Sequence, residues 1–117
     1  MEFTIEFYVT AEGRCPVQEF LDALQESDPD DFAIVLAGLV KLRNRAYHRP
    51  PLSKAIGAGL FELRHVGKLN TRVLYFFMSG HRIVAVHGIR NKGQAIPPRD
   101  RQLAAKRRHD WQERMTP

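Results

Sequence analysis

The sequence predicts an α+β domain in which an N-terminal strand and a helical hairpin pack on an antiparallel sheet, followed by a C-terminal helix. Two observations support this fold class. An alternating strand pattern and two helical segments precede three strand-like runs separated by glycines, and a polar helical segment closes the chain. The length of 117 residues and the hydrophobic fraction of 44% suit a single domain, residues 1–117, with one core.

The N-terminal part is expected to form one strand and two helices. Residues 3–9 alternate apolar and polar side chains, as in a strand with one buried face. Pro16 is well placed as the first residue of a helix, and Asp28 can cap a second one. This second helix is expected to run to about Tyr47, because apolar residues recur every three or four positions until Pro50 stops it.

The rest of the chain is expected to form strands and one helix. The strands are predicted at about 60–66, 70–78 and 82–90, joined by short hairpins, with Ser79-Gly80 as the strongest turn signal. After two prolines, residues 99–115 have helical composition. One side of this helix is expected to carry Leu103, Arg107, Trp111 and Met115.

Charge is divided unevenly along the chain. Residues 1–40 hold one cation and nine acids, whereas the rest holds 17 cations and four acids. This segregation favours a basic face for nucleic acid; the alternative is that acids and bases pair across the fold. The single cysteine, Cys15, and a start without basic residues predict a cytoplasmic protein with no membrane association.

The central strands interleave apolar residues with cations, a pattern typical of a surface for phosphate. A two-residue turn at Ser79-Gly80 would place Arg72 opposite His87, and a three-residue loop at 67–69 would place Arg64 opposite Arg72. These three side chains would then form one row that binds an anion between them.

A second alignment of the first two central strands is equally compatible with the sequence. A two-residue Gly67-Lys68 turn would pair Arg64 with Thr71 and distribute the cations over both sheet faces. The loop length between these strands therefore decides whether a composite anion site exists.

Three ordered runs of sequence match a known family. They are Gly59-Leu60-Phe61-Glu62-Leu63-Arg64, Asn70-Thr71-Arg72-Val73-Leu74-Tyr75-Phe76-Phe77, and Ile83-Val84-Ala85-Val86-His87-Gly88-Ile89-Arg90-Asn91-Lys92 followed by Pro97. Together they resemble the RelE/HigB toxin superfamily, and most nearly its phage-derived, HigB-like branch. The resemblance implies a type II toxin that enters the ribosomal A site, cuts mRNA there and is neutralised by a cognate helix-turn-helix antitoxin.

The resemblance also implies roles for individual residues. Arg64 corresponds to the basic residue of the family's first central strand, Arg72 to the arginine of the next strand, and Lys92 or Arg90 to the basic residue after the last strand. Two positions depart from the family. The second basic position of the first strand is Glu62, and the C-terminal tyrosine of some RelE members has no clear counterpart.

The chemistry implied is metal-independent endoribonuclease cleavage without a cofactor. Arg64 and Arg72 suit stabilisation of the charged transition state, and Lys92 suits the same task or protonation of the leaving oxygen. His87 is the candidate for acid–base catalysis; alternatively it is a partly buried strand histidine bonded to a carbonyl.

Further cations are expected to contact the RNA or ribosome backbone. For those near the C-terminus the alternative is a solvated helix face. The full set is Lys68, Arg90, Arg99, Arg101, Lys106, Arg107 and Arg108.

Two other functions fit the same residues: a non-catalytic nucleic-acid-binding module, and an inactive toxin homologue that binds an antitoxin. Replacing Arg72 by alanine is expected to separate them, because it should abolish growth arrest and mRNA cutting while leaving folding and antitoxin binding intact. A small adjacent gene with a helix-turn-helix pattern would favour the toxin.

Overall fold

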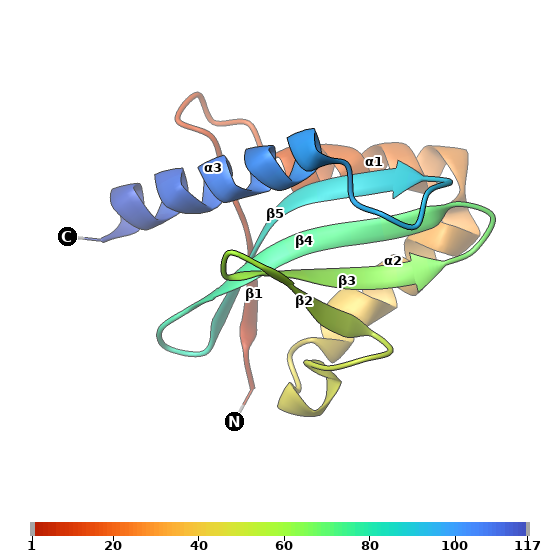
Figure 1. Ribbon diagram of the computed structural model, residues 1–117, viewed down its shortest axis with the longest axis horizontal. Helices are drawn as coiled ribbons and strands as arrows, with labels where there is room; N and C mark the ends of the chain where they lie inside the picture. Colours follow the sequence, from red (N-terminus) through yellow and green to blue (C-terminus); the bar gives the residue numbers. More distant parts are fainter. Residues whose placement is uncertain (1, 117) are drawn as a thin grey trace.

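The computed structural model describes residues 2–116, which form three α-helices and a five-stranded mixed sheet (Figure 1). The sheet order is β1-β5-β4-β3-β2, with β1 parallel to β5 and all other neighbours antiparallel. The predicted α+β class is confirmed. The elements are β1 (Thr4–Phe7), α1 (Pro16–Ser27), α2 (Pro29–Lys41), the short 3-10 helix η1 (Arg45–Tyr47), β2 (Ser53–Gly57), β3 (Leu60–Val66), β4 (Asn70–Met78), β5 (Arg82–Asn91) and α3 (Pro98–Met115).

The helices cover opposite faces of the sheet, so two apolar layers sandwich it. α1 and α2 pack on one face, where Leu21, Val35 and Tyr75 belong to one buried core cluster. On the other face α3 buries Ala104 and Trp111 against the sheet. β4 therefore has buried side chains on both faces, which explains its nearly continuous apolar sequence.

The start of α2 is as predicted, but its end is not. The Asp28 carboxylate accepts a hydrogen bond from the Asp31 N–H at 3.1 Å and caps the helix. α2 ends at Lys41, well short of Tyr47, because backbone groups beyond Lys41 form hydrogen bonds that do not continue the helix. The Asn44 side chain accepts from the Ala46 N–H at 2.9 Å, forming a local turn that replaces the helical continuation.

Three other sequence predictions need correction. β2 was not predicted, because this edge strand buries only Ser53 and has no clear alternating pattern. The N-terminal segment departs from the one-face pattern at Tyr8, which follows β1 and is buried on the α3 side, where it packs edge-on against Trp111. The buried stripe of α3 runs through Ala104 and Trp111, whereas Leu103 and Met115 are largely exposed.

Gly88 in β5 lets α1 approach the sheet closely. A Cβ atom at this position would lie 2.3 Å from the Phe20 ring, inside van der Waals contact. Gly88→Ala is expected to lower the free energy of unfolding by about 1–3 kcal/mol, because α1 must shift outward. Urea denaturation measures this, with Gly93→Ala as the matched control, since its Cβ would meet no atom closer than 3.9 Å. Equal stability of both variants would contradict the packing.

Candidate nucleic-acid interface

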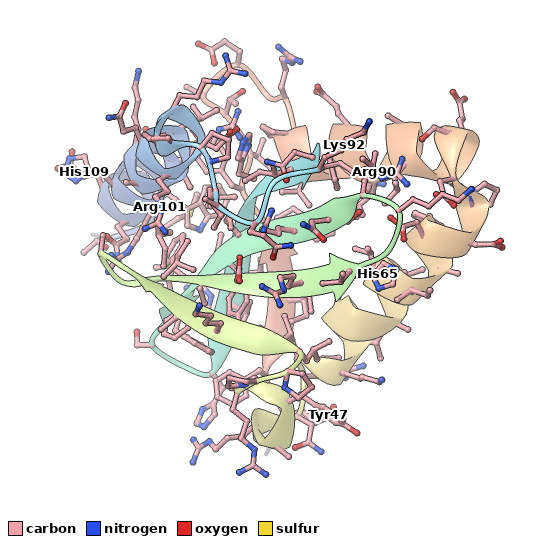
Figure 2. All side chains as sticks on the ribbon, turned by 45° about the vertical axis from the view of Figure 1, so that its right-hand side comes forward. Tyr47, His65, Arg90, Lys92, Arg101 and His109 are labelled. Carbon is pink, nitrogen blue, oxygen red and sulfur yellow. The ribbon has the colours of Figure 1, made fainter. Side chains whose placement is uncertain are left out.

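The candidate site lies on the sheet face that carries α3. α3 packs on β5 and β4, and two of its arginines reach the β2–β3 turn. Arg101 donates to the Ile56 carbonyl at 2.8 Å, and Arg108 donates to the Ala58 carbonyl. Figure 2 shows the ribbons of β2 and β3 on the near side with no helix in front of them. These uncovered strands are the part of the sheet that a nucleic acid can reach.

Arg64 and Arg72 are direct partners across β3 and β4, as the three-residue loop at 67–69 predicted. The alternative pairing of Arg64 with Thr71 is excluded, since Thr71 faces His65. Directly opposed residues lie on one face of a sheet, so both arginines belong to the α3 side.

His87 does not lie opposite Arg72, so this part of the predicted row is wrong. Arg72 faces Ile89, two residues further along β5. There are two causes. The loop of residues 79–81 has three residues rather than two, and a bulge leaves Val86 without a partner on β4. Each of these changes shifts the register by one residue. A total shift of two residues keeps His87 on the same sheet face as Arg72 but displaces it along β5.

Arg72 is buried beneath this face, with 1% of its surface exposed. Its Nε lies 3.1 Å from a Glu62 carboxylate oxygen, close enough for an ion pair although the N–H is not directed along a hydrogen bond. Its two terminal nitrogens donate to the Asn91 side chain at 3.1 Å and to the carbonyls of Gly93 and Gln94 at 3.4 and 2.6 Å. Arg72 therefore fixes the loop that follows β5.

The cations that face solvent here are Arg64, Lys54 and Lys92. Arg64 is part-buried, and within residues 2–116 no carboxylate lies at ion-pair distance from it. Lys54 is exposed and faces Glu62 across β2 and β3. Lys92 is exposed in the loop that Arg72 holds. Sequence reasoning missed Lys54 because it lies on the unpredicted strand β2.

His87 is held between two residues of α3. Its Nε2 lies 2.7 Å from an Asp100 carboxylate oxygen, and its Nδ1 lies 3.1 Å from an Arg107 nitrogen. A guanidinium can only donate hydrogen bonds, so Nδ1 is the acceptor. Nε2 is then the protonated nitrogen, and its N–H donates a hydrogen bond to the Asp100 carboxylate. This is the arrangement of a neutral imidazole, with a carboxylate as its partner and not the carbonyl considered above.

Arg90 points to the opposite face and meets the junction of α1 and α2 (Figure 2). It bonds Asp28 at 2.6 Å and lies 3.4 Å from Asp31. The buried Asp31 carboxylate also accepts from Thr71 at 2.6 Å and contacts His65 at 2.7 Å. Arg90 thus serves as the counter-ion of an acidic cluster. The alternative of acid–base pairing across the fold holds for this part of the chain.

The Asp28 carboxylate makes stability depend on pH. The Asp31 N–H, and then Arg90, lower its pKa below the ordinary value. A lowered folded-state pKa means that the stabilisation is present at neutral pH and is lost as pH falls below about 4. Asp28→Asn keeps a helix-capping side chain but removes the charge, so it isolates the ion pair.

Thermal unfolding of Asp28→Asn is expected to show a lowered Tm at pH 7 and a much smaller difference at pH 2.5. Asp22→Asn serves as the control, because Asp22 is exposed and accepts only from Gln18. An equal loss of Tm at both pH values would rule out a contribution from the charge.

Several cations of α3 are anchors of the helix. Arg107 donates to the Val86 carbonyl at 2.8 Å and lies over the Tyr8 ring, and burial lowers its pKa. Arg108 lies over the Phe76 ring at 5.7 Å. Of the cations predicted to contact RNA or ribosome backbone, Lys68, Arg99 and Lys106 are exposed, and their side chains have neither an ion-pair nor a hydrogen-bond partner among residues 2–116, whereas the exposed Arg101 is held by the Ile56 carbonyl.

Two general features complete the description. Within residues 2–116, no three histidine, cysteine or acidic side chains come together as a metal-binding group. None of the helices in this part of the chain has the length and apolar character needed to cross a membrane.

The three α-helices, of which α3 is the C-terminal one, and the five-stranded mixed sheet form an α+β fold consistent with a RelE-like fold. A family model described as Phage derived protein Gp49-like (DUF891) matches residues 19–109. The chain therefore belongs to the Gp49-like family, which is of the RelE/HigB-like toxin type and is associated with toxin–antitoxin systems. A search of curated proteins found no match.

Proposed function

We propose that this protein is a HigB-like type II toxin that cleaves mRNA on the ribosome without a metal ion, in the cytoplasm, until a cognate helix-turn-helix antitoxin binds it. The observation that supports this most directly is Arg64. It is a part-buried arginine on the open sheet face with no counter-ion among residues 2–116, and Lys54 lies on the same face. A guanidinium in this setting favours a phosphate ligand.

The reaction uses the RNA's own 2′-hydroxyl. Its oxygen bonds to the adjacent phosphorus while the bond from phosphorus to the 5′-oxygen breaks, leaving a cyclic phosphate and a 5′-hydroxyl. Arg64 stabilises the negative charge on the phosphate oxygens in the transition state. Lys92 donates the proton that the leaving 5′-oxygen needs. Arg72 contributes from below by holding the Lys92 loop in place.

His87 is the candidate for the group that takes the 2′-hydroxyl proton. The nitrogen that would accept the proton is Nδ1, which receives a hydrogen bond from Arg107 in the free protein. This role therefore requires Arg107 to release Nδ1 when RNA binds. Asp100 would then stabilise the charged ring through Nε2.

Expression in a bacterial host, with and without the proposed helix-turn-helix antitoxin, tests the proposal. We expect growth arrest and new mRNA ends, both suppressed by the antitoxin. In a purified system, mRNA should be cut only when ribosomes are present. Growth arrest without new mRNA ends would contradict the nuclease assignment, and cutting of free mRNA would contradict ribosome dependence.

An inactive homologue that binds RNA or an antitoxin without cutting is the second candidate. It is favoured by Glu62, which occupies a position where the family resemblance implies a basic residue and which pairs with Arg72. This candidate predicts antitoxin binding and RNA binding by the purified protein, with no new mRNA ends under any condition.

A further inference from the structure

A cationic pocket of about 460 Å³ lies next to Arg64, at the start of β2. Lys41, Tyr47 and Arg49 line it together with Arg64 and Leu52, and no acidic side chain does so. Its volume is within the range of about 300–1,000 Å³ that small-ligand sites occupy. The pocket is formed by the segment between α2 and β2, which none of the sequence motifs covers.

The charges of this pocket have no internal counter-ion. Within residues 2–116, neither Lys41, Arg49 nor Arg64 takes part in an ion pair. By contrast, Arg14, Arg43 and Arg82 each pair with a carboxylate. Three cations around one hollow without an acid create a positive potential that attracts an anion.

The pocket also offers an aromatic surface. Tyr47 is 41% exposed, and the Lys41 ammonium lies 5.7 Å from the centre of its ring. Figure 2 shows Tyr47 on η1, beside the ribbon of β2. An exposed aromatic ring next to unpaired cations is the combination that binds single-stranded nucleic acid, because the ring stacks on a base while the cations contact the phosphate.

The backbone around the pocket is held in place before any ligand arrives. The His48 ring is bonded to the Leu42 carbonyl at 2.6 Å. Further along, the Ser53 N–H donates to the Arg49 carbonyl at 3.1 Å. A pre-formed site loses less conformational entropy on binding than a mobile loop does.

We propose that this pocket binds one unpaired nucleotide of the substrate mRNA, next to the phosphate that Arg64 contacts. The base stacks on Tyr47, and Arg49 and Lys41 contact the phosphate. Stacking reads no base edge, so the pocket holds the strand without selecting a sequence. The inference rests on the proposed function, because it takes RNA as the substrate of the Arg64 face.

Binding of a fluorescein-labelled single-stranded oligoribonucleotide to the intact protein, measured by anisotropy, tests the pocket independently of cleavage. Tyr47→Ala is expected to weaken binding about tenfold, and Tyr47→Phe to preserve it. Arg49→Gln should weaken binding and reduce the salt-dependence slope by about one. Arg45→Gln is the matched control, because this exposed arginine belongs to the same segment but lies over the Phe3 ring, outside the pocket.

Unchanged affinity of Tyr47→Ala, with or without an effect of Arg49→Gln, would overturn the nucleotide assignment. Circular dichroism spectra of each variant establish that it is folded.

In ribosome complexes, 4-thiouridine placed in the mRNA should crosslink to the pocket; a crosslink to ribosomal RNA alone would overturn the assignment to the substrate strand. If the wild type binds RNA through Tyr47 but cuts no mRNA, the pocket stands and the nuclease proposal fails. If mRNA is cut but Tyr47→Ala binds RNA normally, the nuclease proposal stands and the pocket assignment fails.

Discussion

Arg72→Ala is expected to lower the free energy of unfolding by about 3–5 kcal/mol, because it leaves the Glu62 carboxylate buried without its partner. The carbonyls of Gly93 and Gln94 lose their donor in the same step. The measurement is urea denaturation followed by circular dichroism. Lys106→Ala, an exposed change on α3, should stay within about 0.5 kcal/mol of the wild type.

A double variant separates the charge from the packing. Arg72→Met combined with Glu62→Leu removes both members of the buried pair and should recover most of the stability. If the free energy of unfolding of Arg72→Ala were within about 1 kcal/mol of the wild-type value, that result would contradict the buried ion pair. This expectation revises the one drawn from the sequence, in which Arg72 could be replaced without harm to folding. Loss of toxicity in Arg72→Ala is therefore no evidence for direct contact with RNA.

On the proposed function, Arg64→Ala is expected to reduce the rate of mRNA cleavage about a hundredfold, because the transition state loses one cation that stabilises its negative charge. Its stability should change by no more than about 0.5 kcal/mol, since no ion pair among residues 2–116 depends on it. Single-turnover cleavage on ribosomes measures the rate. Arg64→Lys should restore part of it, because an ammonium keeps the charge but not the bidentate grip.

The matched control for Arg64 is Arg99→Ala. Arg99 is an exposed cation near the start of α3 and has no ion-pair partner among the described residues. Its loss should weaken association in a salt-dependent way and leave the single-turnover rate at saturation unchanged. A wild-type rate in Arg64→Ala would remove Arg64 from the reaction and leave the RNA-binding module as the better function.

Most of the fold could be predicted because local signals and burial agree. The three central strands were found from their apolar runs, and the α2 start from Asp28. β2 escaped because an edge strand with one buried residue carries no hydrophobic signal. The end of α2 was misplaced because apolar spacing continues past Lys41, whereas the side chain of Asn44 turns the backbone.

The site was predicted less well, for physical reasons that residue types alone do not reveal. The pairing of Arg64 with Arg72 followed from a loop length, which a sequence can suggest. The displacement of His87 came from a bulge, and a bulge depends on the packing of the finished sheet. Counter-ions such as Glu62 for Arg72 are chosen by the fold, so unpaired cations could not be told from paired ones in advance.

Because β1 pairs in parallel with β5, the first strand of the chain cannot join the sheet until the last strand has been synthesised. Thr4 has its partner at Arg82, so the sheet closes only after nearly all of its sequence has left the ribosome. Such long-range pairing also slows folding once the chain is free. On the proposed function, late closure delays formation of the RNA-binding surface until synthesis is almost over, which protects the ribosome that is producing the protein.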